Sequence, residues 1–180
     1  MPSPSDLHIA AQPPLTRDEA RWWARVGVLA SLALVLCYIE TFIPLPIPIP
    51  GIKLGLANIA VLVALELLDM KGAAIVAVLK VLAAGFLFGN PLMMLYSAGG
   101  TLLAFAVMAA LSRIRGLSVV LVAIAGAVMH NIGQVAVASL VLGTPLVWYS
   151  APVLVVAAFA TGAVTGFAAR YALDCLGESR

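Results

Sequence analysis

The chain has 180 residues, of which 63% are hydrophobic and 10% are charged, and its net charge at neutral pH is +2. Soluble domains average about 45–50% apolar and about 25% charged residues, so this chain has too few charged side chains to cover a surface that faces water. The composition therefore predicts a membrane protein that contacts the lipid bilayer. No basic run with interleaved aromatic residues indicates a nucleic-acid partner.

The two ends of the chain are more polar than its middle. We expect a polar, disordered N-terminal tail over residues 1–20, a transmembrane domain over residues 21–173 and a short C-terminal tail over residues 174–180. The first apolar run is longer than the about 7–15 residues of a signal peptide, so we expect it to be a span. Cys37 and Cys175 stand alone, so neither a disulfide framework nor a zinc site is expected.

Apolar runs recur along the middle of the chain, and a spanning helix needs about 20 mainly apolar residues. We predict an all-α membrane protein with a six-transmembrane-helix bundle. The six segments are Trp22–Ile43, Leu54–Leu68, Gly72–Phe88, Leu92–Leu111, Leu117–Leu142 and Leu146–Tyr171. The second segment is short, so an alternative is that it forms one bent hydrophobic hairpin with the third, buried in the protein.

Basic residues gather on one side of this six-span layout. That side carries Arg17, Arg21, Arg25, Lys71, Arg113, Arg115, Arg170 and Arg180. The other side carries Lys53 alone. Because lysine and arginine accumulate in cytoplasmic loops, we predict a multi-pass protein of the cytoplasmic (inner) membrane with both termini in the cytoplasm.

Proline occupies every second position from Pro44 to Pro50, with apolar residues between. Proline is incompatible with a helix interior and pushes the preceding residue toward extended geometry. Irregular backbone at membrane depth persists only where it is buried in protein or lines a wet cavity. We therefore predict that this strip is a lid over the outer mouth of the bundle, between the first two helices. The alternative is an ordinary rigid loop at the outer lipid interface.

Polar side chains inside apolar segments are costly and usually face a protein interior or a cavity. The notable ones are Glu40, Lys53, Asn58, Lys80, His130, Asn131 and Gln134. Lys80 and His130 lie near the middle of their segments and the others lie further outward. Gln134 follows His130 by four residues, which places both on one helical face. Together they predict a cavity that opens outward beneath the proline strip.

Each of these polar residues also has a purely structural interpretation. Lys80 could extend its stem toward the inner interface, and Glu40 and Lys53 could form an interfacial ion pair. His130 could be a neutral, hydrogen-bonded bridge between helices, and the amide side chains could serve as interhelical contacts. Rows of small residues, such as Ala158 and Gly162 in the last segment, pack helices in lipid, either within the bundle or against another subunit.

Five motifs occur in a fixed order along the chain. They are Gly51–Asn58 (GIKLGLAN), Leu87–Pro91 (LFGNP), Leu95–Gly100 (LYSAGG), Gly126–Gln134 (GAVMHNIGQ) and Val141–Pro145 (VLGTP). Over roughly residues 25–170 the chain resembles the Gx transporter family, which has also been labelled heptaprenyl diphosphate synthase component I. That family is similar to the S components of energy-coupling factor (ECF) transporters, which are six-helix substrate-binding proteins with a loop covering an outward site.

The resemblance implies two functions. The first is binding of a vitamin-like solute, with a flavin as our first expectation, for transport; a transmembrane coupling subunit and ATPase subunits would then be partners. The second is a membrane-held accessory of a soluble heptaprenyl diphosphate synthase in isoprenoid quinone biosynthesis. The chain has no P-loop and no aspartate-rich diphosphate motif, so we do not expect it to be an enzyme.

Two lysines and a histidine against one acid favour a ligand with anionic or carbonyl oxygens, and apolar surroundings favour an amphipathic one. The candidate substrate-binding residues are Glu40, Lys53, Asn58, Lys80, Asn90, Tyr96, His130, Asn131 and Gln134. No catalytic residue, metal ligand or cofactor is expected.

Overall fold

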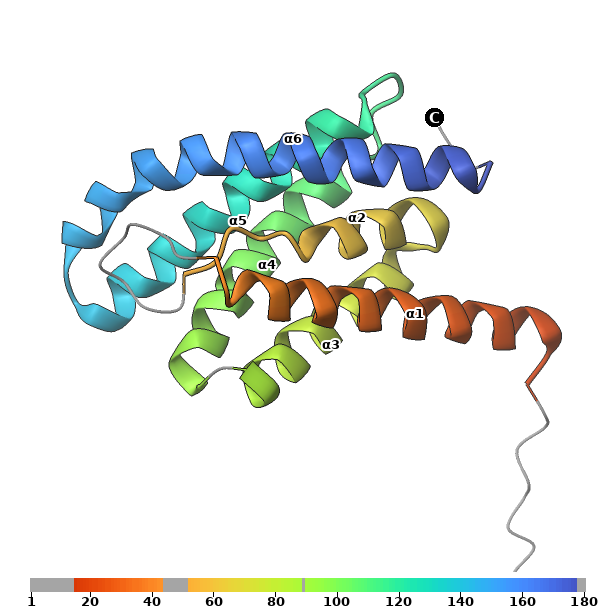
Figure 1. Cartoon of the computed structure of the whole chain (residues 1–180), viewed down its shortest axis with the longest axis horizontal. Coiled ribbons are helices and arrows are strands. Elements are labelled where there is room, and N and C mark those ends of the chain that lie inside the picture. The colour runs from red at the N-terminus through yellow and green to blue at the C-terminus, as the bar shows by residue number, and fades with distance from the viewer. Residues whose placement is uncertain (1–14, 44–51, 89, 178–180) are drawn as a thin grey trace, which may run out of the picture.

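The computed structural model describes residues 15–43, 52–88 and 90–177, and the helices in these ranges are shown in Figure 1. The helices are α1 (Arg17–Glu40), α2 (Asn58–Leu67), α3 (Met70–Phe88), α4 (Pro91–Leu111), α5 (Val119–Leu142), the short 3₁₀ helix η2 (Pro145–Ser150) and α6 (Ala151–Cys175). The predicted lid over Pro44–Pro50 lies outside the described residues.

Local capping sets where the helices begin. At the start of α1, the Thr16 hydroxyl accepts a hydrogen bond from the Glu19 N–H at 3.3 Å, and the Glu19 carboxylate accepts one from the Thr16 N–H at 2.8 Å. This reciprocal pair is a capping box. Helix α1 therefore begins at Arg17, inside the tail expected over residues 1–20, and α6 runs two residues past the expected boundary at 173.

Helix α2 is much shorter than the predicted second span, Leu54–Leu68. Its ten residues extend about 15 Å, which is half of the about 30 Å hydrocarbon core. Residues 60–64 are all buried, so α2 is enclosed by its neighbours rather than exposed on one face. It packs against α1, α3 and α6. The structure thus has five long helices and one short inner helix in the described ranges, where six spans were predicted.

The outer surfaces of the long helices are apolar. Five helical segments in the described ranges are long and apolar enough to cross a membrane. Large apolar side chains such as Phe86, Val156 and Phe167 are exposed on them, with 81%, 72% and 62% of their surface accessible. Because soluble proteins rarely expose contiguous apolar surface on this scale, the chain is a helical, multi-pass membrane protein.

The basic residues share one end of the bundle. The beginning of α1, the end of α6 and the turn between α2 and α3 all lie at the right-hand end of Figure 1. This end carries the arginines at the start of α1, together with Lys71 and Arg170. The charge asymmetry on which the orientation was predicted is therefore present in three dimensions, while the assignment of this end to the cytoplasm stays a prediction.

Glycines allow α5 to approach both of its main neighbours closely. A Cβ atom on Gly133 of α5 would lie 2.6 Å from the Gly99 carbonyl oxygen and 2.9 Å from the Gly100 Cα of α4. On the other side, a Cβ on Gly162 of α6 would lie 2.7 Å from the Ile124 Cα. These backbones therefore pack with no side chain between them, as small-residue rows permit in lipid. The row in α6 packs within the bundle.

We predict that Gly133→Ala destabilises the protein by about 1–3 kcal/mol, because backbone atoms of α4 cannot rotate away from the added methyl group. The matched control is Gly27→Ala, since no atom lies within 4 Å of a Cβ at that helical position. We expect the control to be neutral or up to about 1 kcal/mol stabilising. The measurement is the free energy of unfolding in detergent, and equal values for the two variants would contradict this packing.

Candidate functional site

Six polar residues from five segments of the chain converge inside the bundle, and we call them the polar cluster. Its members are Glu40, Lys53, Asn58, Lys80, His130 and Gln134. Lys53 is half-buried, and the other five are buried, with Lys80 and His130 each 2% exposed. They come from α1, α2, α3, α5 and the connection before α2. The structure therefore brings together most of the predicted binding residues.

Residues 52–57 run into the bundle without helical structure. Ile52 and Leu54 are buried in this segment, so its backbone cannot rely on bulk water for hydrogen bonds. The Lys53 N–H donates to Gln134 Oε1 at 2.9 Å, and the Leu56 N–H donates to Glu40 Oε1 at 2.7 Å. The side chains of Glu40 and Gln134 thus satisfy irregular backbone within the protein.

Gly55 lies directly over the cluster. Its φ angle is +85°, a conformation that glycine adopts at no steric cost. A Cβ atom here would lie 2.8 Å from Asn58 Nδ2 and 2.9 Å from His130 Cδ2. The absence of a side chain at this position therefore allows residues 52–57 to cover Asn58 and His130.

Lys80 and Asn58 form the innermost polar pair. Lys80 Nζ donates to Asn58 Oδ1 at 2.7 Å, so the lysine is held inside the bundle and does not extend to the inner interface. Asn58 Nδ2 has no hydrogen-bond partner among residues 15–43, 52–88 and 90–177. A lysine ammonium carries three donors and no acceptor. The pair therefore offers more donors than the described residues accept.

His130 and Gln134 are joined one helical turn apart on α5, as their spacing predicted. Gln134 Nε2 lies 2.7 Å from His130 Nε2. Gln134 Oε1 already accepts from the Lys53 N–H, so its amide nitrogen must donate and His130 Nε2 must accept. This assigns a neutral imidazole with its proton on Nδ1. That nitrogen lies against α4, where a Cβ on Gly100 would be 2.8 Å away.

Two amines and one carboxylate share the cluster without pairing directly. Glu40, Lys53 and Lys80 are close enough for their charges to influence one another. However, the structure shows ion pairs between Asp18 and Arg21 and between Arg170 and Asp174, and none within the polar cluster among its described residues. The interfacial ion pair between Glu40 and Lys53, one of the structural interpretations, is therefore not formed, because Glu40 accepts from backbone instead.

The remaining three candidate residues have structural surroundings of their own. Asn90 is exposed and caps α4, its side chain accepting from the Met93 N–H at 2.9 Å. Tyr96 is 1% exposed and packs in an apolar cluster with Ile52. Asn131 is fully buried and donates through Nδ2 to the Leu154 carbonyl oxygen of α6 at 2.9 Å. Asn131 Oδ1 has no partner within the described ranges.

Sequence reasoning missed two kinds of neighbour of the cluster. Gly55 and Gly100 both pack closely against His130, because a Cβ atom at either position would collide with it. Both glycines lie in the sequence motifs given above. Cys37 is buried within electrostatic reach of Glu40 and Lys80. Cys37 precedes Glu40 by three residues, so both lie on one face of α1. This spacing in the sequence indicated that Cys37 lies near the cluster. No group of three or more metal-binding side chains is present in the described ranges.

Comparison with known proteins gives one family. A family model described as heptaprenyl diphosphate synthase component I matches residues 29–172. The matched range contains every member of the polar cluster. No curated protein and no solved structure matches the chain.

We predict that Glu40 acts mainly as a hydrogen-bond acceptor for the backbone of residues 52–57. Glu40→Gln keeps an acceptor oxygen at the same position along the side chain, so its free energy of unfolding should stay within about 1 kcal/mol of wild type. Glu40→Leu should lower the free energy of unfolding by about 1–3 kcal/mol, because it leaves the Leu56 N–H buried and unpaired. Unfolding in detergent measures both variants. Equal losses for the two variants would show instead that the charge is what matters.

Proposed function

Since the chain belongs to the heptaprenyl diphosphate synthase component I family, which the sequence motifs also connect with Gx transporters, we propose that it is a substrate-binding membrane subunit. In this role it binds a small vitamin-like solute for transport across the cytoplasmic membrane and performs no chemistry itself. Its termini face the cytoplasm.

The pair formed by Lys80 and Asn58 carries this proposal. An ammonium group inside a membrane-spanning bundle is costly unless it has partners, and here the only acceptor at hydrogen-bonding distance among the described residues is Asn58 Oδ1. Asn58 Nδ2, also buried, has no acceptor in the described ranges. A purely structural pair would be expected to satisfy its donors. Unused donors at the centre of the cluster support a ligand that supplies acceptor oxygens.

The chemistry of the polar cluster limits the classes of ligand that it could bind. Lys80, Asn58 and the half-buried Lys53 favour carbonyl or carboxylate oxygens, and nearby apolar side chains such as Ile52 and Tyr96 favour a flat, largely apolar body. A flavin combines ring carbonyls with a planar aromatic system, so it is the solute that we propose first. Residues 52–57 cover Asn58 and His130, so access of the ligand requires this segment to move.

As in the ECF transporters that the motifs resemble, the driving force would come from other subunits. We propose a transmembrane coupling subunit and ATPase subunits as partners, because the sequence carries no nucleotide-binding loop of its own. The solute-binding subunit would then contribute recognition alone.

We predict that a flavin raises the melting temperature of the purified protein in detergent. Lys80→Met and Asn58→Ala should each weaken the apparent affinity about tenfold or more, because each removes a hydrogen bond to a charged or buried partner. Lys71→Met is the matched control, since it removes an exposed lysine at the beginning of the same helix. No response to riboflavin or its phosphorylated forms would refute the flavin assignment, and equal affinities for all variants would refute the site.

The family description favours a second candidate, a membrane accessory of a heptaprenyl diphosphate synthase. In this role the chain would hold a soluble catalytic subunit at the bilayer, where its long-chain product partitions.

The accessory role predicts that deletion of the gene changes the length of the isoprenoid side chain on the cell's quinone, because a displaced synthase would release its product differently. Mass spectrometry of extracted quinones measures this length, with the deletion complemented by the Lys80→Met variant as control. Restoration by this variant would favour the accessory role, because that role does not use the polar cluster. An unchanged side chain in the deletion strain would contradict it.

A further inference from the structure

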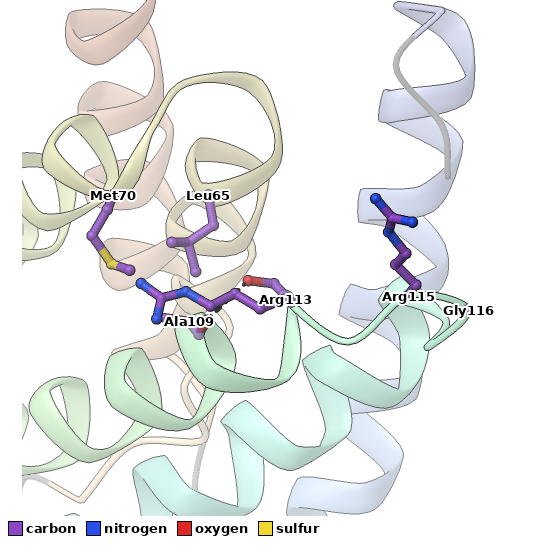
Figure 2. A pocket seen from close by; sticks show the side chains of 7 residues that line it. Leu65, Met70, Ala109, Arg113, Arg115 and Gly116 are labelled. Carbon is purple, nitrogen blue, oxygen red and sulfur yellow. Dashed lines mark hydrogen bonds between the residues drawn. The ribbon is translucent and has the colours of Figure 1, made fainter.

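A hollow lined by apolar side chains and two arginines lies at the basic end of the bundle, away from the polar cluster. Its volume is about 630 Å³, and it lies between the α2–α3 turn and the α4–α5 loop. Leu65, Met70 and Ala109 give it an apolar wall, and Arg113 and Arg115 supply its charge. In Figure 2, Arg113 extends across Ala109 toward Met70, while Arg115 lies on the opposite side and its side chain extends away from Arg113.

Neither Arg113 nor Arg115 forms an ion pair with a carboxylate among the described residues. Both are exposed, and the ion pairs found in the described ranges involve Arg21 and Arg170 instead. Guanidinium groups present several donors in a fixed, planar arrangement that matches phosphate oxygens. The hollow therefore combines two unpaired phosphate-binding side chains with an apolar wall.

The surroundings indicate which phosphate compound fits. Ile114, between the two arginines in sequence, has 52% of its surface exposed. Of the wall residues, Met70 begins α3, which is long and apolar enough to cross the membrane. A ligand in this hollow would contact the arginine side chains at the end of the bundle and apolar side chains along the wall. Basic pockets between transmembrane helices at the cytoplasmic face bind the headgroups of anionic lipids. A soluble phosphate would leave the apolar wall unused.

We propose that this hollow binds the phosphate group of an anionic phospholipid from the leaflet at this end of the bundle. Arg113 and Arg115 contact the headgroup, and the acyl chains lie along the apolar wall toward the bilayer. The site is separate from the polar cluster, so it stands or falls independently of the ligand proposed there.

The test uses the full chain purified in a mild detergent and native mass spectrometry to count bound lipids. The probes are cardiolipin, phosphatidylglycerol and phosphatidylcholine, with inorganic phosphate as the soluble competitor. The variant Arg113→Gln/Arg115→Gln is compared with Arg170→Gln, which removes an arginine at the same end of the bundle outside the hollow. Melting temperatures without lipid establish that both variants are folded.

We expect wild type and Arg170→Gln to retain the anionic lipids in preference to phosphatidylcholine. The double variant should lose about twenty-five-fold in affinity, because each basic side chain near an anionic headgroup contributes about fivefold. Equal retention in the double variant would overturn the proposal. Displacement of the lipid by millimolar inorganic phosphate would also overturn it, because it would identify a site for a soluble phosphate.

Discussion

The structure depends on how residues 52–57 satisfy their backbone inside a membrane protein. This segment is buried and non-helical, and an unpaired N–H group in such surroundings costs several kcal/mol. Glu40 from α1 and Gln134 from α5 accept hydrogen bonds from the Leu56 and Lys53 N–H groups. These bonds allow α2 to begin deep in the bundle, and that depth places Asn58 beside Lys80. The polar cluster therefore follows from one irregular stretch of chain.

The polar residues of the cluster have two different roles, which the sequence does not distinguish: some satisfy backbone groups, and others keep donors for a ligand. Glu40 and Gln134 are engaged by backbone, and His130 is held by Gln134 and by the close approach of Gly100. Lys80, Asn58 and the Nδ1 of His130 instead keep donors that the described residues do not accept. A polar side chain in a membrane helix therefore does not by itself indicate a ligand-binding site, because it can instead form hydrogen bonds with backbone groups of the same protein.

The sequence predicted the long apolar helices and the alignment of His130 with Gln134, since both follow from helical periodicity. The capping role of Asn90 was also within reach, because an asparagine followed by proline is a typical helix start. For the second segment, the sequence left open a membrane span or a buried hairpin with the third segment. It could not decide between them, because the apolar run Leu54–Leu68 has the same composition in both cases. The contact of Gly55 with Asn58 was equally hidden, since it depends on a backbone angle and a long-range approach.

The glycine contacts of α5 also bear on motion. Where Gly133 meets Gly99 and Gly162 meets Ile124, main chain lies against main chain, and sliding or tilting would force backbones into collision. Interiors packed in this way shift between discrete arrangements rather than deforming gradually. The C-terminal half, α4 to α6, is therefore a stiff frame. Any rearrangement that admits a solute must be absorbed by the N-terminal half. There the chain before α2 is anchored by side-chain hydrogen bonds to Glu40 and Gln134 and by the packing of Ile52 and Leu54.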